Sequence, residues 1–290
     1  LLVLACVTAG LAHFVTSLLR TGRGPVATTG LPLPLPPLPA PAPLPAPAEL
    51  FLGRQTDLDQ LVLWLLDEDP GPIAVLGPGG IGKTALTRAA LCDERCADRF
   101  GARRLFVPLE EARDAVAVHH AVARALGLAA SDRPTRQVLA ALRASPTLLV
   151  LDNAETPWEA DREETQNTLA RLALVPGVSL IASLRGYELP TGANWRPLIL
   201  EPLAEGASGT LFLAVAGQRF AADPALSDLL THLDGLPLAI ELVAHRARDE
   251  PDAATVLRQW QAQRGRYPVR DGGGTKDLDL AASIALYVTA

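Results

Sequence analysis

A glycine-rich stretch near residue 80 has the residue types and spacing best suited to chemistry. Its members are Gly77, Pro78, Gly79, Gly80, Ile81 and Gly82, and Lys83 and Thr84 follow at once. This spacing fits the pattern G-x-x-x-x-G-K-[ST], in which backbone N–H groups surround a phosphate chain without interference from Cβ atoms. We expect the ammonium of Lys83 to reach the β- and γ-phosphates and the hydroxyl of Thr84 to ligate Mg²⁺. We expect Ala85, the next residue, to contact the nucleotide as well. The stretch therefore predicts a nucleotide-binding site.

Three charged residues that follow later apolar runs could take part in the same chemistry. Asp152 ends the run TLLVLD, where its carboxylate could hold Mg²⁺ beside Thr84 or simply cap a turn. Glu155 is the next acid and could polarise an attacking water, or it could be a surface turn residue. Arg185 follows SLIASL and could contact the γ-phosphate, although arginines are also common on protein surfaces. The expected catalytic residues are Lys83, Asp152, Glu155 and Arg185, and the expected metal ligands are Thr84 and Asp152.

Short apolar runs and helix-like segments alternate through the middle of the chain. The runs lie at residues 73–76, 105–107, 148–151, 178–182 and 198–200, and the helix-like segments lie at 57–66, 112–126, 136–143 and 163–174. Apolar runs without alternation, separated by helical patterns, indicate a parallel sheet with helices on both faces. Ligands of such sheets lie at the carboxyl ends of the strands, where the glycine-rich stretch and Asp152 also fall. The expected fold class is α/β.

From residue 201 the pattern becomes helical. Leucines at 226, 229, 230 and 233 repeat with helical spacing, and Asp223 with Pro224 predicts the N-cap and first turn of that helix. Pro237 should begin a second helix and Asp252 a third. We therefore expect a P-loop domain over residues 49–200 and a small all-helical domain over residues 201–290.

The first 48 residues differ in composition from the rest. Residues 1–19 are almost wholly apolar, so a helix there would be about 28 Å long, enough to span a bilayer, with Arg20 and Arg23 holding the following chain on the cytoplasmic side. A buried helix of a truncated N-terminal domain or a targeting segment is the other interpretation of residues 1–30. Residues 31–48 are proline-rich and predict a polyproline II spacer of roughly 55 Å, or else a ligand for proline-reading domains. Because the chain begins at Leu1 and has no Met, we expect a piece of a longer protein.

Charge argues against one class of partner, and the cysteine and histidine spacing argues against disulfide bonds and metal sites. The formal net charge is −6 and no basic patch stands out, which argues against nucleic acid as the main partner. Cys6, Cys92 and Cys96 have neither disulfide nor zinc spacing, and Cys92 and Cys96 should share one helix face. The five histidines show no metal-ligand spacing. A cytoplasmic protein, with a possible membrane tether through residues 1–19, fits these features.

Five signatures stand in one order along the chain: FLGR (51–54), GPGGIGKT (77–84), LLVLDNAE (148–155), SLIASLRG (179–186) and GLPLAI (235–240). Together they resemble the STAND class of P-loop NTPases, in particular the NB-ARC-like and novel-STAND domains of NLR-type proteins, and most closely the fungal members. The resemblance covers residues 49 to about 288. It implies an ASCE-type parallel sheet of order 5-1-4-3-2 and a helical lid domain. It also implies that Gly53 and Arg54 lie against adenine, that Pro237 closes over the base and ribose, and that Arg185 senses the γ-phosphate.

The sequence departs from that family at Asn153, where NB-ARC members usually carry a second acid after the metal-binding Asp152. Hydrolysis should therefore be slow or depend on Glu155. The family's winged-helix domain and repeats do not occur in this sequence. The leading hypothesis is an ATP/ADP switch, using Mg²⁺, that controls self-association and signalling to a protein effector. The other hypotheses are a turnover ATPase of AAA or origin-binding type acting on protein or DNA, and a membrane-tethered adaptor in which the nucleotide is only structural.

Overall fold

Five parallel strands form the sheet on which the described part of the chain is built. The computed structural model describes residues 40–264 and Ile284. The strands are β1 (Ile73–Gly77), β2 (Arg104–Pro108), β3 (Thr147–Asp152), β4 (Val178–Arg185) and β5 (Arg196–Ile199). Their order is β2-β3-β4-β1-β5 and every neighbouring pair is parallel. The predicted α/β class and the order 5-1-4-3-2 are therefore confirmed, since the two orders are the same sheet read from opposite edges.

Strand β5 begins earlier than the predicted run at residues 198–200. Its pairing with β1 aligns Ile73 with Arg196 and Ala74 with Pro197. Because β5 is an edge strand, the missing N–H of Pro197 removes no bond from the interior of the sheet. The start of β5 is therefore set by its pairing with β1 and not by where its apolar residues begin.

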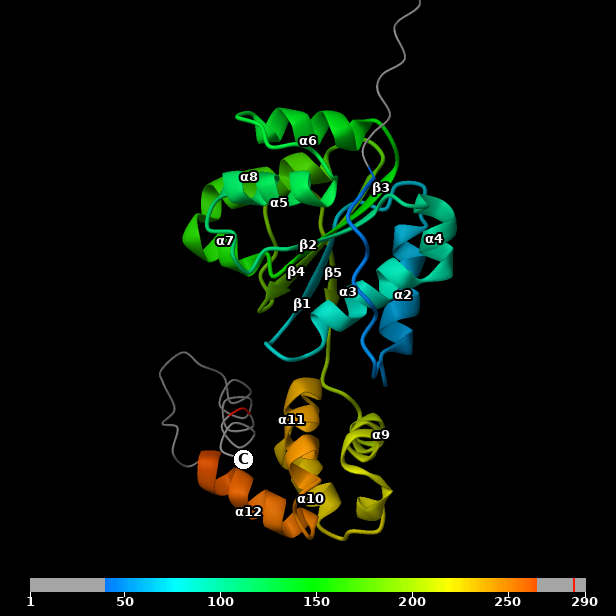
Figure 1. The fold of residues 1–290 in the computed structure, drawn as a ribbon, viewed down its shortest axis with the longest axis vertical. Helices are drawn as coiled ribbons and strands as arrows, with labels where there is room; N and C mark the ends of the chain where they lie inside the picture. Colours follow the sequence, from blue (N-terminus) through cyan, green and yellow to red (C-terminus); the bar gives the residue numbers. More distant parts are fainter. Residues whose placement is uncertain (1–39, 265–283, 285–290) are drawn as a thin grey trace, which may run out of the picture. The chain divides into compact units, whose positions relative to one another are not determined.

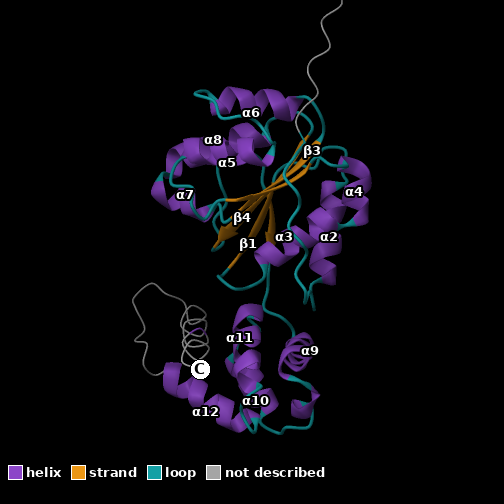
Figure 2. Ribbon diagram, in the orientation of Figure 1, coloured by secondary structure: helices purple, strands orange, loops and turns teal. Residues whose placement is uncertain are grey.

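Helices cover both faces of the sheet (Figures 1 and 2). They are α2 (Gln55–Leu65), α3 (Lys83–Cys92), α4 (Glu94–Phe100), α5 (Ala115–Ala125), α6 (Pro134–Arg143), α7 (Glu155–Ala160) and α8 (Arg162–Ala173). Alternate residues of the strands face two separate cores. Ile73, Val75 and Val150 pack with α2, α3 and α4, whereas Ala74, Leu76 and Leu151 pack with α5, α6 and α8. Burial on both faces explains why these strands lack polar alternation.

The expectation that Cys92 and Cys96 share a helix face is wrong. Helix α3 ends at Cys92, and Asp93 starts α4 by accepting a hydrogen bond from the backbone N–H of Arg95 at 2.9 Å. An aspartate side chain that can cap a new helix competes with continuation of the old one.

After the sheet the chain is helical, with α9 (Glu205–Ala216), the 3₁₀ turn η1 (Gln218–Phe220), α10 (Leu226–His232), α11 (Pro237–Ala247) and α12 (Ala253–Arg264). Pro237 stands in the first turn of α11, as expected. The predicted N-cap Asp223 is wrong, because the residue before α10 is Ala225. Asp223 instead accepts from the N–H of Ala225 at 2.9 Å and from that of Ala253 at 2.7 Å, so it joins the starts of α10 and α12.

The end of the proline-rich segment lies on the sheet domain rather than extending away as a plain spacer. We call residues 40–54 the strap. The N–H of Ala42 donates to the carbonyl of Ala125 at 2.9 Å, and Leu44 packs against the core that contains α2 and α3. The predicted apolar segment at residues 1–30 and the first part of the proline-rich segment lie outside the described residues. Among the residues described, no helix has the length and apolar content needed to cross a membrane.

Candidate functional site

The glycine-rich stretch forms a loop between β1 and α3, at the carboxyl edge of the sheet. Gly80 and Gly82 have φ values of 74° and 102°, in the left-handed region that glycine adopts at little cost. Ile81 between them is fully buried in the core with α2 and α3. A buried isoleucine flanked by two glycines holds the loop in place while it leaves the loop's backbone uncovered for a ligand.

Lys83 lies within this loop and is 8% exposed. Its Nζ donates to the carbonyl oxygens of Gly77 at 2.9 Å and Pro78 at 3.0 Å. Burial lowers the pKa of the Lys83 ammonium, and the carboxylates of Glu155 and Asp152 oppose that shift. The structure thus places one cation among uncharged carbonyls at the start of α3, where the helix dipole also favours anions.

Thr84 and Asp152, the two expected metal ligands, are brought together by the sheet. The hydroxyl of Thr84 donates to Oδ2 of Asp152 at 2.8 Å, and the carboxylate of Asp152 is almost fully buried. Ser183 on β4 donates to the other carboxylate oxygen at 2.6 Å and accepts from the N–H of Asn153 at 2.9 Å. Hydroxyl and carboxylate oxygens are the ligands that Mg²⁺ prefers, so these donors fit that ion. Sequence reasoning missed Ser183, although it lies within the signature SLIASLRG.

Glu155 begins α7 and lines the same pocket as Lys83. Its Oε2 is buried and has no hydrogen-bond partner among the described residues. Burial raises the pKa of the Glu155 carboxyl, and the positive charge of Lys83 partly reverses that effect. Asn153 also lines the pocket; its φ is 56°, and its side-chain amide donates to Glu110 at 3.1 Å. The position that the family resemblance assigns to a second acid therefore carries an amide turned towards Glu110.

Arg185 ends β4 directly beside Gly77 in the parallel register. It is exposed, and its charge lowers the pKa of Lys83, so it lies near the loop. It does not line the pocket, however. The structure thus places Arg185 at the rim of the site.

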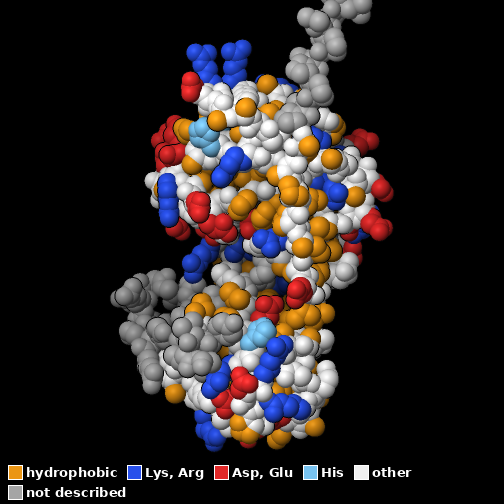
Figure 3. All heavy atoms as spheres, viewed as in Figure 1, with side chains coloured by type: hydrophobic (Ala, Val, Ile, Leu, Met, Phe, Trp, Pro, Cys, Tyr) orange, Lys and Arg blue, Asp and Glu red, His pale blue; other side chains and the backbone are white. Residues whose placement is uncertain are grey.

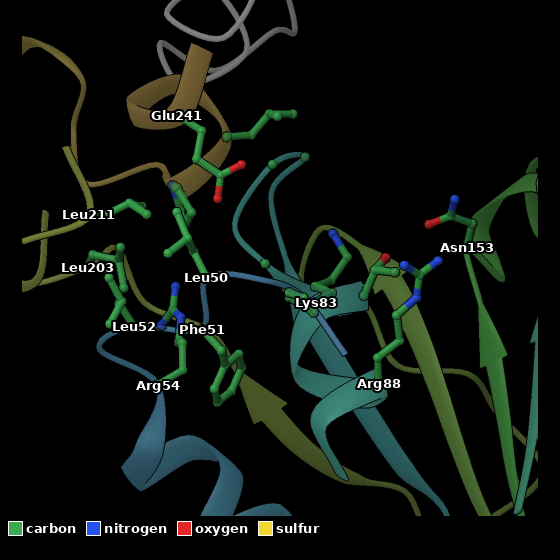
Figure 4. A pocket seen from close by; sticks show the side chains of 18 of the residues that line it. Leu50, Phe51, Leu52, Arg54, Lys83, Arg88, Asn153, Leu203, Leu211 and Glu241 are labelled. Atoms are coloured by element: carbon green, nitrogen blue, oxygen red, sulfur yellow. The ribbon is translucent and has the colours of Figure 1, made fainter. Parts of the chain in front are cut away.

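The pocket has a volume of about 540 Å³ and two chemically different ends (Figure 4). One end is formed by the loop and the start of α3, through Gly79, Gly80, Gly82, Lys83, Thr84 and Ala85. The other is apolar and is formed by Leu50, Phe51, Leu52, Leu203 and Leu211. We call them the phosphate end and the base end. Of the residues predicted from sequence, Arg54, Glu155 and Pro237 also line the pocket, whereas Gly53, Gly77, Pro78, Ile81 and Asp152 are not among the residues that line it.

The pair Gly53 and Arg54 connects the strap to the loop. Arg54 is 6% exposed; its Nη2 donates to the carbonyl of Ile81 at 2.9 Å and its Nη1 pairs with Asp57 at 3.1 Å. Gly53 has a φ of 69°, and a Cβ there would lie 2.6 Å from Cβ of Ala207. Glycine is required at residue 53 because the strap turns sharply against α9.

Helix α11 also contacts the loop. The N–H of Leu238 donates to the carbonyl of Gly80 at 3.2 Å. Pro237, Leu238 and Glu241 of this helix line the pocket together with the loop. Sequence reasoning did not identify Glu241 or the apolar residues of the base end as site residues. Leu203 and Leu211, for example, join the site only through tertiary packing.

Charged side chains of both signs are interspersed on the face shown in Figure 3. Arginines on this face are not gathered into one continuous basic surface. Within residues 40–264 and Ile284, no group of three or more His, Cys, Asp or Glu side chains could hold a metal ion.

Comparison with protein families finds one match, to a model described as Novel STAND NTPase 1, over residues 44–199. That range is more than half of the chain. No curated protein matches the sequence.

Several solved structures resemble the fold at low sequence identity. A Walker-type ATPase of Pyrococcus abyssi is 14% identical with a TM-score of 0.50, over 74% of this chain and 73% of that chain. The ORC1 protein of Aeropyrum pernix, in complex with DNA, is 18% identical with a TM-score of 0.49, over 82% of this chain and 66% of that chain. A STAND protein of Pyrococcus horikoshii with a tetratricopeptide repeat sensor is 15% identical with a TM-score of 0.45, over 76% of this chain and 34% of that chain. The chain thus spans about two thirds of the ORC1 protein and about a third of the STAND protein. At these identities the likeness concerns the fold alone, which is that of P-loop ATPases.

Proposed function

This chain belongs to the novel STAND NTPase 1 family, and on that premise we propose that it is a nucleotide-dependent molecular switch. In this proposal it binds ADP and ATP with Mg²⁺, hydrolyses ATP slowly, and changes its self-association and its contact with a protein effector according to the nucleotide bound. ADP holds the helices after the sheet against the loop, and exchange for ATP releases them.

The observation that carries the proposal is that two parts of the chain form the wall of the pocket. The phosphate end comes from the sheet domain, while Leu203, Leu211, Pro237 and Glu241 come from segments after the sheet. A nucleotide that fills the pocket therefore touches both parts, and the hydrogen bond from Leu238 to Gly80 joins them beside the phosphate loop. An added γ-phosphate can favour one arrangement of the two parts over another because it adds charge where they meet.

The phosphate chemistry follows from residues at one edge of the sheet. The loop N–H groups and Lys83 neutralise the phosphates, with the ammonium moving from its carbonyl partners to the ligand. Thr84 and Asp152 would hold Mg²⁺, which supplies positive charge to the β- and γ-phosphates when bound. Arg185, at the rim, is the residue we propose as the γ-phosphate sensor.

Slow hydrolysis follows from the acids present. Asn153 cannot act as a base, and its amide is directed to Glu110. Glu155 lies in the pocket wall beside Lys83, and its raised pKa suits a carboxylate that must accept a proton from water. We therefore assign to Glu155 the role of polarising the attacking water.

The test is the nucleotide that the full chain carries after purification, followed by single- and multiple-turnover hydrolysis with and without Mg²⁺. Tightly retained ADP, one slow turnover of added ATP and a shift in oligomeric state between ADP and ATP would support the switch. Protein that carries no nucleotide and hydrolyses ATP steadily over many turnovers would contradict it and favour an ATPase that works on a protein or DNA substrate.

A further inference from the structure

Glu241 is an acid in the pocket wall that the phosphate chemistry does not use. It lies on α11, one turn after Pro237, and it lines the pocket together with Gly80 and Lys83. Figure 4 shows its carboxylate directed into the pocket. The side chain is half-buried, and among the described residues no hydrogen bond or ion pair engages its carboxylate.

A carboxylate in this pocket conflicts with the charge of the expected ligand. Nucleoside di- and triphosphates carry several negative charges, and two like charges in a partly buried site repel each other. Glu241 can therefore be favourable only beside a part of the nucleotide that donates hydrogen bonds. Those parts are the ribose hydroxyl groups and, in adenine, the exocyclic amine.

The position of Glu241 along the pocket selects between these donors. Leu203 and Leu211 lie on one side of Glu241 at the base end, and Lys83 lies on the other side at the phosphate end (Figure 4). In a nucleotide the ribose connects the base to the phosphates, so it occupies the middle of such a pocket. Glu241 faces that middle position.

Helix geometry supports the same placement. The first turn of α11 is fixed at the phosphate loop, because the N–H of Leu238 donates to the carbonyl of Gly80. Pro237, in the same turn, lies next to Gly82, where a Cβ would be 3.9 Å from its Cγ. Glu241 comes four residues after Pro237, which is about 6 Å further along the helix axis. That step leads away from the loop by about the distance that separates the phosphates from the sugar.

We propose that Glu241 accepts hydrogen bonds from the 2′- and 3′-hydroxyl groups of the bound nucleotide and so selects ribonucleotides over deoxyribonucleotides. The proposal rests on nucleotide binding in this pocket. It makes Glu241 a specificity-determining residue, and it gives α11 a second contact with the nucleotide beside that of Pro237.

The test compares the affinities of the full chain for ADP, 2′-deoxy-ADP and IDP, measured by titration calorimetry after removal of retained nucleotide. A hydrogen bond to a charged group contributes enough affinity for about a tenfold preference for ADP over 2′-deoxy-ADP in the unchanged protein. Glu241→Ala should bind ADP about tenfold more weakly than the unchanged protein does, and it should bind ADP and 2′-deoxy-ADP with equal affinity. Glu241→Gln, which keeps the shape of the side chain, should retain an intermediate preference. Glu201→Gln, at an exposed glutamate outside the pocket, is the control and should change nothing.

Two outcomes would overturn the assignment of Glu241 while nucleotide binding stands. One is an unchanged ratio of ADP to 2′-deoxy-ADP affinity in Glu241→Ala and Glu241→Gln. The other is loss of discrimination between ADP and IDP in these variants, which would place the carboxylate at the base. Failure of the unchanged protein to bind ADP at all would contradict the proposed function and the assignment together.

Discussion

The two ends of the pocket are assembled in different ways. The phosphate end is nearly continuous in sequence, from Gly79 to Ala85, and it stands on a buried strand and a buried Ile81. The base end draws on Leu50, Phe51 and Leu52 of the strap, on Leu203 and on Leu211 of α9. The first end is therefore fixed by local chain geometry, and the second exists only while distant segments pack together.

This difference suggests separate roles for the two ends: the phosphate end binds the phosphates, and the base end changes its packing in response. Two hydrogen bonds, from Arg54 to the carbonyl of Ile81 and from Leu238 to the carbonyl of Gly80, connect the strap and α11 to the loop. Both use carbonyl oxygens of the loop backbone. A ligand that reshapes the loop can therefore change the base end without any change in the sheet. Two ligands can distinguish the two regions in solution. Pyrophosphate should contact the phosphate end alone, whereas ADP should fill both ends, so a change at the base end should alter the affinity for ADP and not that for pyrophosphate.

The largest effect should come from the phosphate end. Lys83→Ala removes the ammonium that faces the loop, and loss of charge-assisted hydrogen bonds to phosphate should weaken binding of both ADP and pyrophosphate about 100-fold. Calorimetric titration of both ligands measures this. Lys276→Ala, the same change at a lysine outside the signatures, should leave both affinities unchanged. Equal affinity of Lys83→Ala and the unchanged protein for ADP would refute the phosphate-loop interpretation.

The sequence predicted the phosphate end well because its determinants are local. The glycine spacing and the apolar run before Lys83 are enough to predict the loop. Unbroken apolar runs likewise predict strands that are buried on both faces, as β3 is. None of the residues of the base end was predicted, and Arg54 and Pro237 of the pocket wall were predicted only through the family resemblance. Nothing in the spacing of Leu203 or Leu211 connects them to residue 80, since that contact depends on how α9 packs.

The errors have a similar cause. Proline content shows that residues 40–48 cannot join a sheet, but not that Leu44 packs on a core or that Ala42 reaches Ala125. Asp223 has the right type for an N-cap, yet its carboxylate reaches Ala253, 30 residues away. In each case a tertiary partner decides between conformations that are equally acceptable locally.

An intermediate effect should come from Gly53 at the base end. Gly53→Ala forces a side chain into a left-handed conformation and brings its Cβ to 2.6 Å from Ala207, which should lower the free energy of unfolding by about 1–3 kcal/mol. ADP should bind several-fold more weakly, because the strap can no longer approach α9, whereas pyrophosphate binding should hardly change. Denaturant unfolding and titration of both ligands measure these effects.

Gly206→Ala is the matched control for Gly53→Ala. Gly206 lies in α9 with open space around its Cα, so alanine there should leave binding unchanged and stabilise the helix by up to about 1 kcal/mol. If Gly53→Ala weakened pyrophosphate as much as ADP, the two ends would be one structural unit and the distinction between them would be lost.

The smallest effects should come from the two acids of the pocket wall, Glu155 and Glu241, of which Glu241 lies between the two ends. Burial raises the pKa of both Glu155 and Glu241, so the folded state disfavours their ionised forms. A raised pKa means that the folded state binds the proton more tightly than the unfolded state does. This penalty is absent below the unfolded pKa near 4.5, grows as the pH rises from there through the folded pKa, and is constant above it. Glu155→Gln and Glu241→Gln should therefore each raise the free energy of unfolding slightly at pH 7 and leave it unchanged at pH 4.

The two acids should differ in their response to Lys83, which sharpens the contrast between the ends. The Lys83 charge favours ionised Glu155, whereas burial is the cause that shifts Glu241. In a Lys83→Ala background, Glu155→Gln should therefore stabilise the protein at pH 7 more than it does in the unchanged protein, and Glu241→Gln should stabilise it equally in both. Urea unfolding of the unchanged protein, the three single variants and the two double variants at pH 4 and pH 7 measures this, with Glu201→Gln as the exposed control. The same response of both acids to Lys83→Ala would mean that the charge of Lys83 also reaches Glu241, and that the phosphate end is coupled to the rest of the pocket electrostatically as well as through the backbone of the loop.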